Sequence, residues 1–187
     1  MKLAISNIAW PAMVDDLAFD NLRSQGIHAL EVAPTRLWPH WQGISSAAIK
    51  EASLLFSGNG LHVSSLQALL FGRANCVLFG TKVERQAMLD HLSLCADIAL
   101  GLGATRLVFG APGNRRLGSV SASEALQTAA EFFHLVGGQY HSNGLVLCFE
   151  PNPAQYGCDF ATTSAEAAAL VVAGDSPGFR LHLDTAC

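Results

Sequence analysis

The chain has 187 residues, of which 50% are apolar and 14% are charged, so it can bury a full core as a single domain spanning residues 1–187. Its formal net charge of −4 and isoelectric point near 5.9 argue against nucleic-acid binding, because the longest basic cluster is Arg115-Arg116. No window holds the roughly 18 apolar residues of a membrane span, and five cysteines without a Cys-x-x-Cys pair favour reduced thiols. We expect a cytoplasmic protein with no nucleic-acid or membrane partner.

Apolar runs typical of buried strands recur along the chain. They cover residues 2–9, 27–34, 61–68, 105–110, 145–149 and 179–184. Gly26, Gly60 and Gly144 lie directly before three of these runs, at positions where a preceding helix commonly ends. The sequence therefore predicts six strands that are separated by helices.

Helical periods lie between the apolar runs. The first helix is expected to begin near Pro11 and to bury Val14, Leu17, Ala18 and Leu22. A long loop is expected around Trp38 and Trp41, after the second strand. The clearest helical period runs from Glu84 to Leu100, and Ser121 and Thr163 each begin a capping-box spacing that predicts a helix start.

Strand and helix thus alternate through five complete units, and a sixth strand follows. Loops after the predicted strands are long and carry unusual residues, whereas loops before them are short and rich in glycine. This asymmetry predicts an α/β protein with a parallel sheet, an incomplete TIM-type barrel whose chemistry lies at the carboxyl ends of the strands. A doubly wound open sheet also fits the strand count, but Ala9-Trp10-Pro11 lacks the glycines of a Rossmann phosphate loop.

Two of the predicted strands end on a carboxylate. Glu150 follows the apolar run Leu145–Phe149, and Asp184 closes the next one. Burying a glutamate at the end of an apolar strand is costly unless something binds it, and successive parallel strands deliver their ends to one edge of a sheet. The pattern favours a shared site, although each acid alone has the alternative of capping a helix or pairing with an arginine.

Several of these strand ends resemble a known family. They are Leu30-Glu31-Val32-Ala33-Pro34, Leu66-Gln67-Ala68-Leu69-Leu70-Phe71-Gly72, Val108-Phe109-Gly110-Ala111-Pro112-Gly113-Asn114-Arg115, Glu150-Pro151-Asn152-Pro153 and Leu181-His182-Leu183-Asp184-Thr185. Together they resemble the sugar phosphate isomerase/epimerase group of xylose isomerase-like TIM barrels, along essentially the whole chain.

The resemblance implies a divalent ion, of Mn, Mg, Co or Zn, held by four side chains. Glu150 and Asp184 match the glutamate of strand five and the aspartate of strand six, and Glu150 would also be the catalytic acid/base. The histidine of strand seven and the glutamate of strand eight have no counterpart before Cys187. We therefore expect the N-terminal part of a barrel, with an incomplete metal site and impaired activity.

Further residues near the predicted strand ends are candidates for substrate binding. They are Glu31, Gln67, Asn114, Arg115 and His182. Arg115 follows the fourth strand, where a guanidinium can bind a phosphate or carboxylate, and His182 shares a strand face with Asp184 and can orient it. A surface arginine, a core histidine and loop-anchoring hydrogen bonds are the respective alternatives.

The resemblance implies a metal-dependent isomerase or epimerase that moves a proton next to the carbonyl of a small sugar or sugar phosphate. Cys187 and Tyr156 stand where ketose 3-epimerases of the family place a histidine and a glutamate, which argues against that subgroup. The alternatives are a non-catalytic fragment or partner-dependent half-barrel and, less favoured, a related sugar dehydratase or endonuclease IV-like enzyme. The open edge of such a fragment makes a homo-oligomer possible.

Overall fold

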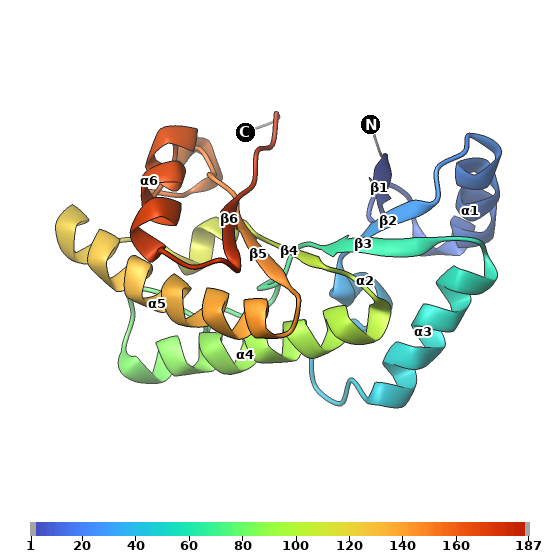
Figure 1. The fold of residues 1–187 in the computed structure, drawn as a ribbon, viewed down its shortest axis with the longest axis horizontal. Helices are drawn as coiled ribbons and strands as arrows, with labels where there is room; N and C mark the ends of the chain where they lie inside the picture. Colours follow the sequence, from blue (N-terminus) through green and yellow to red (C-terminus); the bar gives the residue numbers. More distant parts are fainter. Residues whose placement is uncertain (1–2, 186–187) are drawn as a thin grey trace.

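The computed structural model describes residues 3–185 and contains one six-stranded parallel sheet (Figure 1). The strands are β1 (Ala4–Ser6), β2 (Ala29–Val32), β3 (His62–Leu66), β4 (Arg106–Phe109), β5 (Val146–Phe149) and β6 (Phe179–Leu181). Each strand pairs in parallel with the next one in sequence, from β1 to β6. The predicted parallel sheet of an incomplete TIM-type barrel is thereby confirmed, since a doubly wound sheet would reverse its strand order.

The helices wrap around one side of this curved sheet (Figure 1). They are α1 (Asp15–Ser24), α2 (Pro34–Leu37), α3 (Ser46–Gly58), α4 (Lys82–Leu102), α5 (Ala122–Ser142) and α6 (Ser164–Gly174), with short 3₁₀ turns η1 (Ala12–Val14), η2 (Pro112–Asn114) and η3 (Ala154–Tyr156). The predicted capping boxes at Ser121 and Thr163 are present, and Thr81 forms a third. None of the helices in this part of the chain is long and apolar enough to cross a membrane.

Two local predictions are wrong. Leu17 was expected inside, but its side chain is 61% exposed, and the buried residues of α1 are Phe19 and Leu22. The 3₁₀ turn η1 precedes α1, which begins at Asp15. Leu17 and Leu22 are five residues apart, about 140° around the helix, so they do not share the face that Phe19 and Leu22 bury. The stretch after β2 contains the one-turn helix α2, with Pro34 in its first turn, where only a loop was expected.

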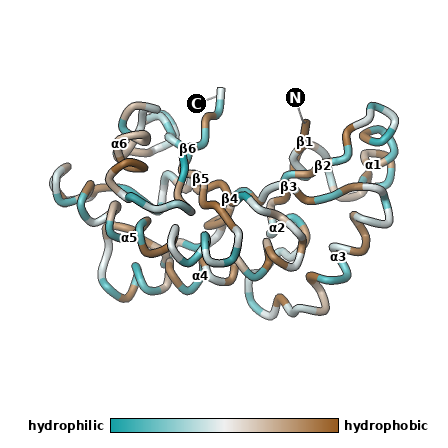
Figure 2. The backbone as a smooth tube through the Cα atoms, in the orientation of Figure 1, coloured by the Kyte–Doolittle hydropathy of each residue, from teal (hydrophilic) through white to brown (hydrophobic). Residues whose placement is uncertain are grey.

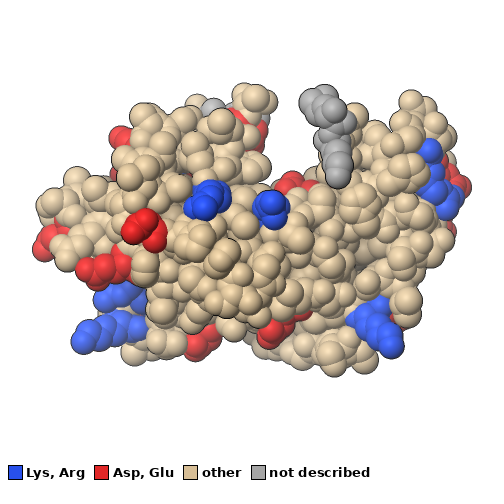
Figure 3. Space-filling model, viewed as in Figure 1, with Lys and Arg blue, Asp and Glu red and all other residues tan. Residues whose placement is uncertain are grey.

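The core lies between the sheet and the helices. Phe133 of α5 stacks on Phe179 of β6 with 4.6 Å between ring centroids, and it meets Phe109 and Phe149 edge to face. Figure 2 shows hydrophobic residues concentrated in β4 and β5, the middle of this layer. In Figure 3 the charged side chains are few and scattered over the face in view, as the low charged fraction predicts.

Candidate active site

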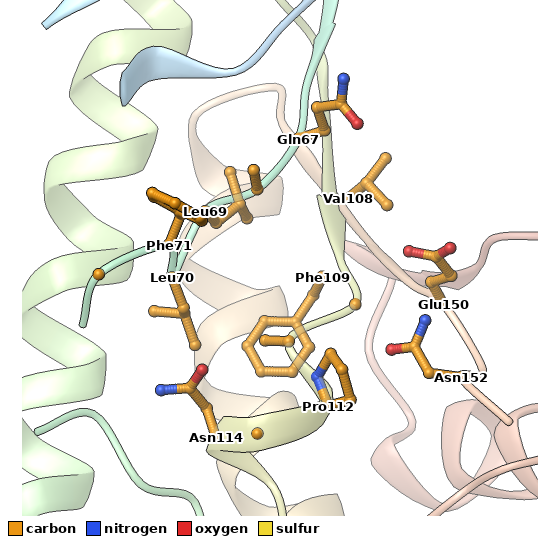
Figure 4. Close-up of a pocket in the computed structure, with 15 residues that line it drawn as sticks. Gln67, Leu69, Leu70, Phe71, Val108, Phe109, Pro112, Asn114, Glu150 and Asn152 are labelled. Atoms are coloured by element: carbon orange, nitrogen blue, oxygen red, sulfur yellow. The ribbon is translucent and has the colours of Figure 1, made fainter. Parts of the chain in front are cut away.

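A cavity of about 460 Å³ opens where the carboxyl ends of β3, β4 and β5 meet (Figure 4). It is lined by residues 67–72 after β3, residues 108–114 at the end of β4 and beyond it, and Glu150 and Asn152 after β5. Figure 4 shows Glu150 and Asn152 beside each other on one side of the cavity, with Leu70 and Asn114 on the other. In parallel barrels this edge of the sheet is where chemistry takes place.

Glu150 is held at the cavity wall by the neighbouring strand. Its backbone N–H donates to the carbonyl of Phe109 at 3.0 Å. A Cβ atom built on Gly110 would lie 2.6 Å from Oε2 of Glu150 and 3.3 Å from Oδ1 of Asn152, so a larger residue would displace the carboxylate from this position. The lack of a side chain at Gly110 thus allows the close approach of Glu150 and Asn152.

Arg115 lies beneath this wall with its side chain fully buried. Its donors and their acceptors are Nε to Gly110 O (2.9 Å), Nη1 to Phe160 O (2.6 Å) and Ala161 O (3.3 Å), and Nη2 to Glu150 O (3.0 Å) and Asn152 Oδ1 (2.8 Å). These are as many hydrogen bonds as a guanidinium has N–H groups. The guanidinium carbon also lies 4.6 Å from the ring centre of Phe149.

This burial corrects the prediction that Arg115 binds a substrate anion. Its donors are already used by the protein, and a fully buried guanidinium does not face a ligand. Burial lowers the pKa of Arg115, while Cys158, Glu150 and Asp159 favour its charged form. The residue instead ties the end of β5 to the loops that follow β4 and β5.

Three alanines next to this network adopt left-handed backbone conformations, with φ of 53° at Ala68, 44° at Ala111 and 51° at Ala161. Such conformations cost a residue with a Cβ atom roughly 1 kcal/mol or more and persist where the surroundings fix them. Ala68 and Ala111 line the cavity, and the carbonyl of Ala161 accepts a hydrogen bond from Arg115. Of the four non-glycine residues with positive φ among residues 3–185, three thus lie around the candidate site, and the fourth, Asp175, is the C-cap of α6.

Three of the predicted site residues line the cavity: Gln67, Asn114 and Glu150. The side-chain amide of Gln67 donates to the hydroxyl of Ser6 on β1. Both amide hydrogens of Asn114 are used, because its Nδ2 donates to the carbonyl of Arg73 at 2.8 Å and to that of Cys76 at 2.7 Å. Asn114 therefore secures the loop after β3 while forming part of the wall.

The other predicted residues lie outside this cavity. Glu31 on β2 accepts a hydrogen bond from the hydroxyl of Ser65 at 2.9 Å. His182 follows β6 directly, is half-buried, and donates its backbone N–H to the carbonyl of Phe149 at 2.8 Å. Asp184 lies further along, in an exposed segment, and Cys187 lies outside the described residues.

The described residues offer carboxylate oxygens for a hard divalent cation, but few of them. Between residues 3 and 185, no three His, Cys, Asp or Glu side chains converge in a way that could hold a metal ion. Glu150 and Asp184 thus fit such an ion in chemical kind and fall short of a full set of ligands.

Sequence reasoning gave no role to Asn152 or Gly110. Asn152 lines the cavity and accepts a hydrogen bond from Arg115, and it stands two residues after Glu150 between two prolines. The Pro-Asn-Pro sequence was a usable signal, because a polar residue fixed between prolines beside a functional acid has a restricted backbone. The close approach at Gly110 depends on contacts across strands and has no local signal.

Six consecutive parallel strands with a cavity at their carboxyl ends define the chain as part of a TIM-type β/α barrel. A family model described as xylose isomerase-like TIM barrel matches residues 19–186. The chain therefore belongs to the xylose isomerase-like TIM barrel family, as the motifs at its strand ends predicted.

Solved structures share this fold at low sequence identity. A D-psicose 3-epimerase from Clostridium cellulolyticum has a TM-score of 0.74 and 15% identity, covering 97% of this chain and 62% of that one. The IolI protein with a bound zinc atom has 0.71 and 15%, covering 99% and 63%. The probable 3-DHS dehydratase AsbF from Bacillus anthracis has 0.69 and 11%, covering 98% and 63%. A comparison with curated protein sequences finds no match.

The chain thus spans less than two thirds of the length of these three structures. The titles name an epimerase and a dehydratase on one architecture, so the fold alone does not decide between those reactions.

Proposed function

We propose that this chain supplies the proton-transferring part of a sugar isomerase or epimerase, with Glu150 as the acid/base group. The observation that carries the proposal is the position of Glu150 on the wall of the cavity, at the carboxyl end of β5 in a parallel barrel sheet. A carboxylate there can remove a proton from the carbon next to a sugar carbonyl and return it to a neighbouring position. Substrates of this class are small polyhydroxy carbonyl compounds, with or without a phosphate group.

The rest of the cavity suits such a substrate. Asn152 and Gln67 place amide groups at the wall, where they can hydrogen-bond hydroxyl groups. Phe71, whose side chain is 70% exposed, and the half-buried Pro112 add apolar surface against which the C–H face of a sugar can pack. The Arg115 network holds Glu150 and Asn152 in place from below, so the polar groups are positioned before a substrate binds.

Glu150 and Asp184 are the residues that we assign to a divalent ion, of Mn, Mg, Co or Zn. A bound ion of this kind polarises a substrate carbonyl and lowers the cost of removing the adjacent proton. The zinc atom named for the IolI structure supports metal binding within this fold. Because the described residues supply few ligands, we expect the ion to bind weakly to this chain.

A second candidate function is that of a half-barrel that acts only together with further strands. The observation that favours it is the open sheet, in which β1 and β6 each pair with a single neighbour among the described strands. Unpaired strand edges are ready to pair with another segment. Loss of activity on dilution, with recovery at high protein concentration, would support this candidate over the first.

The test is the exchange of the substrate proton with solvent deuterium, followed by NMR for a panel of ketoses and ketose phosphates with added Mn²⁺. Exchange needs only the proton-transfer step, so it detects chemistry that is too slow for a turnover assay. We expect Glu150→Gln to slow exchange roughly 10²–10⁴-fold, the usual effect of losing a general base. Glu51→Gln, which changes an exposed glutamate on α3, is the matched control. Equal exchange by the Glu150→Gln variant and the unchanged protein would overturn the proposal.

A further inference from the structure

A smaller cavity of about 350 Å³ adjoins the candidate site and is bordered by an arginine, Arg73. It shares with the larger cavity the residues Leu70, Gly72, Gly113 and Asn114. Figure 4 places Leu70 and Asn114 across the larger cavity from Glu150. The smaller cavity therefore adjoins the side of the site that lies away from the carboxylate.

The guanidinium of Arg73 is half-buried and has no anionic partner. Among residues 3–185 it forms no ion pair, and its side chain forms a hydrogen bond with the thiol of Cys76, which uses only part of its donors. Its Nε atom is buried without a hydrogen-bond partner. Arg115 is the opposite case, since its donors all meet protein acceptors. A partly desolvated cation with unused donors attracts an anion.

The backbone around Arg73 is held by hydrogen bonds, which fixes the point from which its side chain extends toward the cavity. Its N–H donates to the carbonyl of Leu70 at 3.0 Å, and its own carbonyl accepts from the backbone of Cys76 at 3.0 Å and the side chain of Asn114 at 2.8 Å. The turn is therefore attached to the loop that follows β4.

The protein groups that this charge faces are uncharged. Burial raises the pKa of the Cys76 thiol, against the opposing effect of Arg73, and burial lowers the pKa of His91. The thiol and the imidazole are therefore neutral near pH 7. Asp90 also acts on the Cys76 thiol, but it accepts a hydrogen bond from Gln86 at 2.8 Å and forms no ion pair with Arg73. The charge of Arg73 thus remains available.

We propose that the Arg73 cavity binds the anionic end, a phosphate or a carboxylate, of the substrate whose carbonyl end lies at Glu150. This inference rests on the proposed function for its reaction, but the binding of an anion can be tested without it. No acidic residue lines the smaller cavity, so nothing in its wall repels an anion. The sequence suggested that Arg115 binds a substrate anion, and we assign that role to Arg73 instead.

The experiment is an NMR titration of the whole chain, without added metal, with inorganic phosphate and separately with acetate. We expect at least one of these anions to bind near Arg73, and Arg73→Gln to weaken that binding roughly tenfold or more, since a charge-assisted hydrogen bond is lost. Arg73→Lys keeps the charge and should retain part of the affinity, which also separates loss of charge from loss of folding. Arg116→Gln is the matched control, because Arg116 is exposed and its Nε donates a hydrogen bond to the backbone carbonyl of Gly157.

The two anions distinguish the sources of the charge. Tighter binding of phosphate indicates a sugar phosphate, and tighter binding of acetate indicates a sugar acid. Equal affinity of Arg73→Gln and the unchanged chain for both anions, or no binding of either anion, would overturn the inference.

Failure of the proposed function gives a different result. Glu150→Gln should leave phosphate and acetate affinity within about twofold, because Glu150 lies on the other side of the larger cavity. If deuterium exchange of the substrate proton does not depend on Glu150 but anion binding depends on Arg73, the proposed reaction is wrong and the proposed anion site is retained. If deuterium exchange depends on Glu150 but anion affinity is unchanged in Arg73→Gln, only the proposed anion site is wrong.

Discussion

The carboxyl ends of β5 and β6 carry the same sequence pattern and lie in different surroundings. Glu150 follows an interior strand, lines a cavity, and is attached to the buried network of Arg115. Asp184 follows an edge strand and lies in an exposed segment. An apolar run that ends on an acid therefore predicts that the acid lies at the carboxyl edge of the sheet, but not whether it lines a cavity.

The different surroundings of Glu150 and Asp184 follow from the number of strands that pair with β5 and with β6. β5 pairs with β4 on one side and β6 on the other, so the loops of two strands and the buried Arg115 converge on its end. β6 has β5 as its only partner among the described strands. Positioning of a functional group at a strand end is thus a property of the adjacent loops rather than of the strand itself.

The largest expected effect is that of removing Arg115. Arg115→Met keeps much of the side-chain length but leaves the buried acceptors of the guanidinium without a donor. Each buried acceptor left without a donor costs roughly 1–3 kcal/mol, so the variant should lower the free energy of unfolding by about 3 kcal/mol or more, as measured by urea denaturation. Arg116→Met is the control and should change it far less. Equal stability of the two variants would show that the network does not hold the end of β5.

Gly178→Ala tests the packing behind β6. A Cβ atom there would lie 2.1 Å from the carbonyl oxygen of Gly137 and 2.8 Å from the backbone nitrogen of His141, and helix backbone cannot move aside cheaply. We expect a loss of roughly 1–3 kcal/mol in the free energy of unfolding, typical of overpacking. The control is Gly138→Ala, since its Cβ meets nothing within 4 Å and alanine favours the helix. Destabilisation by Gly138→Ala of the same size would remove this explanation.

Gly110→Ala should act on the site more than on the fold. Its Cβ meets the flexible ends of Glu150 and Asn152, which can shift where backbone cannot. We expect a smaller loss of stability than for Gly178→Ala, and slower exchange of the substrate proton because the carboxylate is displaced. Unchanged exchange together with a large loss of stability would reverse this assignment.

The smallest expected effect is the pH dependence contributed by the cap of α5, the helix that packs behind β5. Hydrogen bonds from the side chain and backbone of Ser121 lower the pKa of Glu124 in the folded protein. The folded state therefore favours the carboxylate, so its contribution is present above the unfolded pKa of about 4.3 and is lost as pH falls through the lowered folded pKa. The difference in unfolding free energy between the unchanged chain and Glu124→Gln should shrink between pH 6 and about pH 3. A constant difference would contradict the assigned pKa direction.

Features that depend on local sequence were predictable. The six parallel strands, the helical period of α4 and the caps at Ser121 and Thr163 follow from hydrophobic spacing and short motifs, and the structure confirms them. These elements fix the edge of the sheet at which Glu150 and Gln67 lie.

Features that depend on contacts between distant segments were not predictable. Arg115 and Arg73 look alike in the sequence, yet Arg115 is buried among acceptors that lie up to 46 residues away, whereas the buried Nε of Arg73 has no hydrogen-bond partner. The left-handed conformation of Ala68 and Ala111 is imposed by the surrounding fold, because alanine has no local preference for it. Neither property has a signal in the local residue pattern.

The most direct test of the central claim compares Glu150→Gln and Asp184→Asn in the deuterium exchange assay across a titration with Mn²⁺. If Glu150 transfers the proton and Asp184 only binds the ion, excess Mn²⁺ should restore much of the rate of Asp184→Asn and little of that of Glu150→Gln. Full restoration of Glu150→Gln by Mn²⁺ would contradict the account and leave Glu150 as a metal ligand alone.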